Sequence, residues 1–384
     1  MRLPIDPEYV LRTARRLVQI ESVNPAFCEG RSNEVAVAGV VAGALERLAL
    51  EVTRREPEPG RITVLGRLPG RGGPTLLLYA HLDTVGVEGM AAPFGGALRD
   101  GRIYGRGAYD MKGSLAACLG AVKALVDARV EPPGDVLVAA VADEEAASIG
   151  MTDLLAAIRP DAAIVTEPTE LRLCLAHKGF AWLEVETLGR AAHGSRFEEG
   201  VDANMRMGRF LVELEALERR LRASPPHPLL GPPSLHAAVL RGGTGPSTYA
   251  ASCRLELERR TVPGESEARV VQELREITER LAAADPSFRA EIRPLLYREP
   301  FEARADSRVA STVARLAREV LGAEPARIGL PFWMDAALLA AAGVDTVVIG
   351  PSGAGAHAPE EWVEVDSIVR LAEILAGAAV AYGS

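Results

Sequence analysis

Cysteine is scarce in this chain, and the few cysteines form no recognisable pattern. The four cysteines among 384 residues are scattered, with no C-x-x-C pair. This spacing excludes a disulfide framework and a zinc knuckle, and it makes a reducing cytoplasm the simplest location. The chain also lacks an apolar run of the roughly 18–20 residues needed to span a bilayer, so we expect no membrane association. The N-terminal stretch, with Arg12, Arg15 and Arg16 among periodic apolar residues, predicts an amphipathic helix and no signal peptide.

The sequence also has no excess of basic residues. It has 43 Lys and Arg residues and 52 Asp and Glu residues, which gives a net charge of −9 and a pI of about 5.4. This balance argues against nucleic acid as the main partner, because phosphate binding needs a basic face. Only three of the basic residues are lysines, which we attribute to codon bias. With 48% hydrophobic residues the chain can bury a sizeable core, and its length predicts two domains at roughly 100–200 residues per domain.

Apolar strands alternate with helices along the first half of the chain. We predict helices at 6–20, 31–49, 111–128 and 147–158, and strands at 50–54, 62–66, 75–79, 135–145 and 161–170, the last two ending in acidic residues. The glycines in GRLPGRGGP (66–74) lack the strand–GxGxxG–helix context of a dinucleotide site. Alternation of this kind predicts a largely parallel, buried sheet, in which ligands bind at the carboxyl ends of the strands.

The pattern changes near residue 178. Residues 178–190 alternate like a half-exposed strand, and further elements are predicted at 201–222, 234–241, 248–260, 264–284 and 288–301. Their β-α-β-β-α-β order is ferredoxin-like. Helix and strand patterns then return at 307–321, 335–342 and 346–350. We therefore predict an α/β catalytic domain formed by residues 1–177 and 302–384 and split by an inserted α+β domain over residues 178–301.

Histidine and acidic residues gather where predicted strands end. The segments that carry them are HLD (His81, Asp83), GRGAYDMKGS (Asp110), ADEEAASIG (Glu144, Glu145), TEPTE (Glu167) and GPSGAGAHAPEEW (His357). Each has an ordinary alternative on its own: a surface histidine, an N-cap aspartate or a solvated turn. Adjacent carboxylates at the end of a buried strand, however, repel one another unless a cation is near.

Taken together, these segments favour a metal site. Five strand ends of one α/β sheet would each present an oxygen or imidazole ligand: His81, Asp110, Glu145, Glu167 and His357. Mixed carboxylate and imidazole sets suit Zn²⁺, with Co²⁺ or Mn²⁺ as substitutes. Five protein ligands are too many for one tetrahedral catalytic zinc. They suit two ions that share a bridging carboxylate at a separation of about 3.5–4 Å.

The ordered set HLDT, GRGAYDMKG, DEE, TEPT, GRAAHGS, ERRTVPGE and AHAPEEW resembles a known family. This family comprises the dinuclear zinc metallohydrolases of the acetylornithine deacetylase, succinyl-diaminopimelate desuccinylase, aminoacylase-1 and glutamate carboxypeptidase type. The resemblance runs from about residue 10 to the C-terminus. It implies a zinc-aminopeptidase-like α/β catalytic domain, an inserted ferredoxin-like dimerisation or lid domain, and a homodimer.

The resemblance also implies roles for residues of the predicted catalytic domain. Two divalent metal ions, most simply Zn²⁺, are bridged by Asp110, with His81 and Glu167 on one ion and Glu145 and His357 on the other. Glu144 is the general base that takes a proton from the metal-activated water and delivers it to the leaving amine. Asp83 orients His81.

Two residues of the inserted domain also receive roles by resemblance. His193, in GRAAHGS, stabilises the tetrahedral oxyanion from the partner subunit. Arg260, in ERRTVPGE, binds the α-carboxylate of the substrate as a planar bidentate donor, and Arg259 is the neighbour that could take this role instead. The segment GGTGPSTYAAS departs from the family, because Ser247 and Ala250 occupy places where many members have Asn and Pro.

We therefore expect an amidohydrolase of amino-acid metabolism that releases an acyl group from an N-acyl amino acid, with acetylornithine or a related N-acyl diamino acid as the first candidate. The same motifs fit a carboxypeptidase or dipeptidase that acts on short peptides. A non-catalytic descendant is a third reading, against which the intact Glu144 and the five ligands count. The departure at Ser247 and Ala250 leaves the acyl group open. His177, His227 and His236 match no motif and are interpreted as structural.

Overall fold

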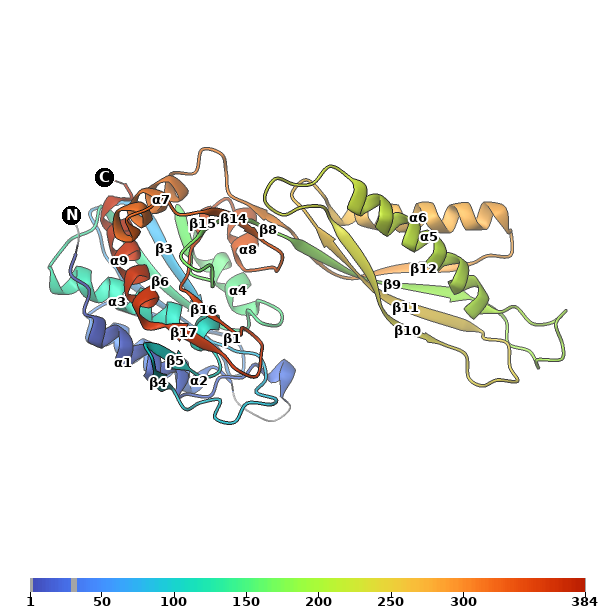
Figure 1. The fold of residues 1–384 in the computed structure, drawn as a ribbon, viewed down its shortest axis with the longest axis horizontal. Helices are drawn as coiled ribbons and strands as arrows, with labels where there is room; N and C mark the ends of the chain where they lie inside the picture. The colour runs from blue at the N-terminus through green and yellow to red at the C-terminus, as the bar shows by residue number, and fades with distance from the viewer. Residues whose placement is uncertain (1–2, 29–32, 384) are drawn as a thin grey trace. The chain divides into compact units, whose positions relative to one another are not determined.

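The computed structural model describes residues 3–28 and 33–383, which form two compact units (Figure 1). Unit 1 comprises Met1–Leu175, Ala303–Ile328 and Met334–Ser384, and unit 2 comprises Ala176–Glu302 and Gly329–Trp333. The short segment Gly329–Trp333 also belongs to unit 2, and the sequence pattern did not predict this. The assignment of catalysis to one unit and dimerisation to the other stays a prediction.

The large sheet has nine strands in the described residues, in the order β1-β2-β6-β3-β7-β15-β8-β13, with β14 paired to β8. They are β1 Glu51–Glu58, β2 Arg61–Leu68, β3 Gly73–His81, β6 Gly134–Val141, β7 Ala162–Val165, β8 Leu173–His177, β13 Phe301–Glu302, β14 Arg327–Leu330 and β15 Asp345–Val348. The four central strands β6, β3, β7 and β15 are parallel. Strands β3, β6 and β7 carry continuous apolar runs that are buried, as expected for a parallel sheet covered on both faces.

Seven α-helices of unit 1 are described (Figure 1). They are α1 Pro7–Val18, α2 Val35–Arg47, α3 Gly113–Asp127, α4 Ile149–Ala157, α7 Arg308–Leu321, α8 Ala336–Ala341 and α9 Val365–Ala381. Helices α3, α7 and α9 pack together, while α2 and α4 lie against β1 and β2. The predicted helix 31–49 begins at residues 31 and 32, which lie outside the described residues. In the part of the chain that the structure describes, no helix combines the length and apolar character needed to cross a membrane.

A small antiparallel sheet positions two loops of unit 1. Its order is β16-β17-β5-β4, with β4 Ala97–Arg99, β5 Arg102–Tyr104, β16 Gly353–Ala354 and β17 Trp362–Glu364. The register pairs Trp362 of β17 with Tyr104 of β5, so the loop that precedes β17 and the turn that follows β5 start side by side. None of these strands was predicted, because two or three residues are too few to show a period.

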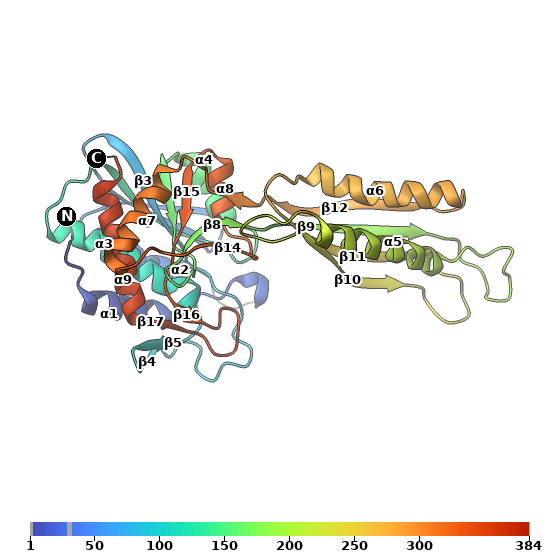
Figure 2. The ribbon, with the colours of Figure 1, turned by 45° about the horizontal axis from the view of Figure 1, so that its top comes forward.

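Unit 2 is a four-stranded antiparallel sheet covered on one face by two helices (Figure 2). Its elements are β9 Gly179–Leu188, α5 Ala203–Ala223, β10 Ser234–Gly242, β11 Ser252–Thr261, α6 Glu267–Ala284 and β12 Ala290–Arg298. The strand order β10-β11-β9-β12 together with this element order is the predicted ferredoxin-like arrangement. Alternate residues of β9 (Ala181, Leu183 and Val185) are buried in the core under the helices, which confirms the predicted half-exposed strand.

Candidate metal centre

Three of the predicted site segments follow neighbouring parallel strands. His81 is the last residue of β3, Glu144 and Glu145 follow β6, and Glu167 follows β7. Because β6, β3 and β7 are adjacent and parallel, their carboxyl ends meet at one edge of the sheet. The alternation of apolar strands and helices in the sequence is therefore enough to bring these residues together.

The prediction that all five ligands lie at strand ends of one sheet is wrong for Asp110 and His357. Asp110 lies in the turn Ala108–Lys112, between β5 of the small sheet and α3, and a cis peptide bond joins it to Met111. His357 lies in the loop between β16 and β17, with a φ of 62°. The pairing of β17 with β5 brings the two segments to the same place, so they reach the site from the small sheet.

Glu361, for which the sequence predicted no role, shapes the Asp110 turn. Its buried carboxylate accepts hydrogen bonds from the main-chain N–H groups of Gly107, Tyr109 and Asp110 at 3.0, 2.9 and 3.0 Å. Arg106 donates to the same carboxylate at 2.7 Å. Glu361 is the second acid of AHAPEEW, and nothing in the sequence distinguished it from a solvated loop residue.

Asp110 lies between two histidines, with one carboxylate oxygen facing each. Its Oδ1 is 3.1 Å from Nε2 of His81, and its Oδ2 is 3.4 Å from Nε2 of His357. Nε2 of His357 is also 3.1 Å from Oε2 of Glu145, while Nε2 of His81 is 3.8 Å from Oε1 of Glu167. The structure therefore brings all five predicted ligands together, as two histidine–glutamate pairs that share one aspartate.

Glu144 lies at the His81 side of this cluster. One oxygen of Glu144, one nitrogen of His81 and one oxygen of Glu167 lie within 4.8 Å of one another. The same holds for His81, Asp110 and Glu145. Within residues 3–28 and 33–383, the Glu144 carboxylate makes no side-chain hydrogen bond, in contrast to Asp110.

The tautomer of His81 follows from its main-chain contact. Nδ1 of His81 is 2.9 Å from the carbonyl oxygen of Asp83, and because a carbonyl oxygen only accepts, Nδ1 carries a proton. In a neutral ring Nε2 then presents a lone pair to the Asp110 carboxylate. Two acceptors at this distance repel each other unless a proton or a metal ion lies between them, so the donor set suits a cation.

Buried carboxylates lead to the same conclusion. Oε1 of Glu145 and Oε1 of Glu167 are buried and have no hydrogen-bond partner among the described residues. Burial, with a further contribution from neighbouring carboxylates, raises the pKa of Glu144, Glu145 and Glu167, that of Glu145 to about 7. Burial also acts on Asp110, but the His357 and His81 rings, which donate to Asp110 when their Nε2 atoms are protonated, outweigh it and hold the pKa of Asp110 well below its usual range. Bound cations would compensate this concentration of negative charge.

We expected the side chain of Asp83 to orient the His81 ring, but the structure places this contact on the main chain of Asp83. Its carboxylate Oδ1 is 3.6 Å from His81 Nδ1, and the hydrogen bond is made by the main-chain oxygen of the same residue. The carboxylate instead accepts the main-chain N–H groups of Glu144 at 3.2 Å and Glu145 at 3.1 Å. Asp83 therefore contacts His81 through its backbone and the Glu144–Glu145 turn through its side chain.

His193 lies in unit 2, on an exposed loop after β9. Its Nδ1 accepts a hydrogen bond from the main-chain N–H of Ser195 at 3.3 Å and lies 2.8 Å from the Ser195 hydroxyl. A main-chain N–H only donates, so Nδ1 is unprotonated in the neutral ring and Nε2 carries the proton. The exposed edge of the ring is thus a hydrogen-bond donor.

The two adjacent arginines of β11 have different surroundings. Arg259 is buried, and its guanidinium lies against Glu265 and 3.5 Å from Glu273. Arg260 is one-third exposed, donates to Glu258 at 2.6 Å and lies with its guanidinium carbon 5.4 Å from the centre of the Phe180 ring. Of the two, only Arg260 is accessible to a substrate.

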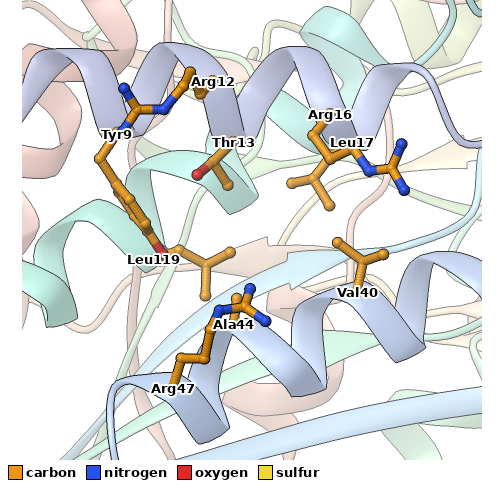
Figure 3. Close-up of a pocket in the computed structure, with 9 residues that line it drawn as sticks. All are labelled: Tyr9, Arg12, Thr13, Arg16, Leu17, Val40, Ala44, Arg47 and Leu119. Atoms are coloured by element: carbon orange, nitrogen blue, oxygen red, sulfur yellow. The ribbon is translucent and has the colours of Figure 1, made fainter.

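A separate pocket of about 180 Å³ lies between α1 and α2 (Figure 3). Apolar side chains form part of its wall, and Arg12, Arg16 and Arg47 also line it (Figure 3). None of its lining residues belongs to the histidine–carboxylate cluster.

Comparison with known proteins identifies the family. Residues 77–381 match peptidase family M20/M25/M40. The chain is 34% identical over 318 residues to the acetylornithine deacetylase of Myxococcus xanthus, which covers 80% of each chain. It is 26% identical over 406 residues to the N-formyl-4-amino-5-aminomethyl-2-methylpyrimidine deformylase of Bacillus subtilis, which covers 96% of this chain and 93% of the relative.

Solved structures share the fold over nearly the whole chain. The aminopeptidase PepT of Bacillus cereus superposes with a TM-score of 0.79 at 19% identity, covering 98% of both chains. The YXEP protein of Bacillus subtilis, described as a dinuclear metal binding peptidase of family M20, gives a TM-score of 0.75 at 16% identity and the same coverage. These matches confirm the predicted zinc-aminopeptidase-like α/β fold with an inserted α+β unit. The chain is therefore a hydrolytic enzyme that acts on amide bonds, and it belongs to peptidase family M20/M25/M40.

Proposed function

We propose that the enzyme hydrolyses the amide bond of N-acyl amino acids, as a deacylase of the acetylornithine deacetylase type. The observation that carries the proposal is the Asp110 carboxylate with one oxygen facing each histidine, flanked by unpaired buried oxygens of Glu145 and Glu167. The match to an acetylornithine deacetylase at 34% identity supports an N-acyl amino acid as the substrate class. The proposed setting is amino-acid metabolism in the cytoplasm.

The proposed cofactors are two divalent metal ions, most simply Zn²⁺. Asp110 would bridge them, with His81 and Glu167 holding one ion and Glu145 and His357 the other. The carboxylate and imidazole donor set suits zinc, with Co²⁺ or Mn²⁺ as substitutes. When bound, such ions supply a Lewis acid for the amide carbonyl and lower the pKa of water.

The residues of this chain would then have separate tasks. Glu144, whose carboxylate makes no side-chain hydrogen bond within the described residues, accepts the proton of the attacking water and passes it to the leaving amine. Arg260 binds the α-carboxylate of the substrate. His193, with a proton on Nε2, donates a hydrogen bond to the developing oxyanion.

A substrate panel with controlled metal content tests the proposal. We expect chelated enzyme to be inactive, and Zn²⁺ or Co²⁺ to restore the release of acid from N-acetyl amino acids, with N-acetylornithine among the best substrates. The reason is that the cluster needs cations to stabilise its ionised carboxylates. Metal analysis of the reconstituted protein should approach about two ions per chain, as a bridging carboxylate requires.

Dipeptides with a free carboxyl terminus are the control substrates in this panel. Faster cleavage of dipeptides than of every N-acetyl amino acid would reject the deacylase proposal and favour a carboxypeptidase or dipeptidase. Full activity at one tightly bound ion per chain would reject the dinuclear site.

Arg260→Ala should weaken substrates with a free α-carboxylate much more than their amidated counterparts. A charge-assisted hydrogen bond contributes about 1.5–3 kcal/mol, so kcat/KM for the free acid should fall about ten- to a hundredfold. The measurement is the ratio of kcat/KM for each acid and its amide, in wild type and variant. Amides lack the charge that the guanidinium pairs with, so their values should change little.

Arg259→Ala is the matched control for this substitution. Because Arg259 is buried against Glu265 and Glu273, its loss should lower the melting temperature and leave the acid-to-amide ratio unchanged. Equal effects of Arg260→Ala on acids and amides would show that this arginine is structural. A changed ratio in Arg259→Ala alone would transfer the role to Arg259.

A further inference from the structure

Behind the metal centre, the buried side chain of Asn24 joins two aspartates. Its Nδ2 lies 2.8 Å from Oδ2 of Asp83 and 2.9 Å from Oδ1 of Asp143. Both contacts are donations from the amide, because an ionised carboxylate only accepts. Its Oδ1 accepts the main-chain N–H of Ala26 at 3.0 Å, so all the polar atoms of the side chain are used.

The two aspartates hold opposite ends of the segment that carries Glu144 and Glu145. Asp83 accepts the main-chain N–H groups of both glutamates, as described above. Asp143 accepts the main-chain N–H groups of Ala147 at 3.2 Å and Ile149 at 3.3 Å with its other oxygen. The Asp83 oxygen that takes the Asn24 amide is the one that holds the N–H of Glu145.

The Asn24 amide lies between the two carboxylates and donates to both. Asp143 is paired with a cation, because Arg61 donates to its Oδ1. Arg61 also lies 3.1 Å from Glu34, and all three side chains are buried. Asp83 is buried and has no ion pair with Lys or Arg among the described residues, and its carboxylate accepts hydrogen bonds from Asn24 and from the main-chain N–H groups of Glu144 and Glu145. Removing the Asn24 donors would leave two buried carboxylates side by side with less compensation.

We propose that Asn24 is a positioning residue for hydrolysis, which fixes the Glu144–Glu145 turn through Asp83 and Asp143. The inference rests on the proposed roles of Glu144 and Glu145. This role differs from a packing role because the amide donates to the two carboxylates, Asp83 and Asp143, whose hydrogen bonds hold the Glu144–Glu145 turn. Loss of such a supporting hydrogen bond typically costs about 10–100-fold in metal affinity or activity.

Asn24→Asp is the diagnostic variant. It keeps the shape and the oxygen that accepts the Ala26 N–H, but it replaces the two amide N–H donors by at most one carboxyl proton, which cannot serve both Asp83 and Asp143. We expect kcat on the best N-acyl substrate to fall about 10–100-fold at saturating Zn²⁺, with KM within about twofold of wild type. Zn²⁺ affinity, measured without substrate by competition with a chromogenic chelator, should fall about 10–100-fold for one of the two ions.

Ser22→Ala is the matched control, because it removes one buried hydrogen bond, to the carbonyl oxygen of Leu82 at 2.7 Å, without touching either aspartate. It should lower the melting temperature and leave kcat and Zn²⁺ affinity near wild type. Asn24→Ala, which removes the donors without adding a charge, serves if the Asp variant does not fold. Wild-type Zn²⁺ affinity and kcat in a folded Asn24 variant, or equal losses in Ser22→Ala, would overturn the inference. The chelator measurement stands even if the proposed substrate is wrong.

Discussion

Glu144→Gln should abolish turnover while both metal ions stay bound. Glutamine keeps the shape of the side chain but cannot accept the proton of the attacking water, and loss of a general base costs about 10²–10⁴ in rate. The surroundings favour this outcome, because the Glu144 carboxylate lies within 4.8 Å of His81 and Glu167 yet makes no side-chain hydrogen bond in the described part of the chain. The measurements are kcat at saturating metal and the metal content of the purified variant.

Glu145→Gln is the neighbouring control and should behave differently. Oε2 of Glu145 is 3.1 Å from Nε2 of His357 and its Oε1 is buried without a partner, so it is the better candidate for a metal ligand. Its substitution should lower metal content together with activity. If Glu144→Gln loses a metal ion, or keeps a kcat near that of the wild type, the roles of the two glutamates are exchanged or Glu144 is itself a ligand.

The part of this site that lies on the large sheet was predictable from local sequence. His81, Glu145 and Glu167 follow apolar strands, and the carboxyl ends of adjacent parallel strands meet whatever the surrounding loops do. The inserted unit was predictable for a similar reason, since its long strands and helices each show a clear period. Its strand order also follows from the common connections of a β-α-β-β-α-β unit.

The parts that could not be predicted depend on short elements and on contacts distant in sequence. Asp110 and His357 meet because β17 pairs with β5, and strands of three residues show no period. Nothing in the sequence marked Asn24 as part of the site, although its amide reaches Asp143, 119 positions along the chain. Helix α9 was also missed, since the sequence after residue 350 was interpreted only as a histidine-bearing loop.

His193→Ala should lower kcat by about 10²–10³ with the metal ions still bound, because a hydrogen-bond donor to an oxyanion contributes roughly 2.7–4 kcal/mol. The hydrogen bond from the Ser195 N–H to Nδ1 leaves the proton of the neutral ring on Nε2, so Nε2 can donate a hydrogen bond to an oxyanion. Ser195→Ala is a useful companion variant. It removes the hydroxyl beside Nδ1 but keeps the main-chain N–H, so it should cost much less than His193→Ala.

We propose that His193 serves the active site of the partner subunit in a homodimer, since it belongs to unit 2 and the predicted metal ligands belong to unit 1. Mixing inactive His193→Ala chains with inactive Glu144→Gln chains tests this proposal. If His193 acts on the partner, a mixed dimer has one site with both residues intact, and it should recover up to about half of the wild-type activity per dimer. If His193 acts within its own chain, every site in the mixed dimer lacks one of the two residues. Heterodimers verified by differently tagged chains, but without recovered activity, would therefore rule out action across the interface.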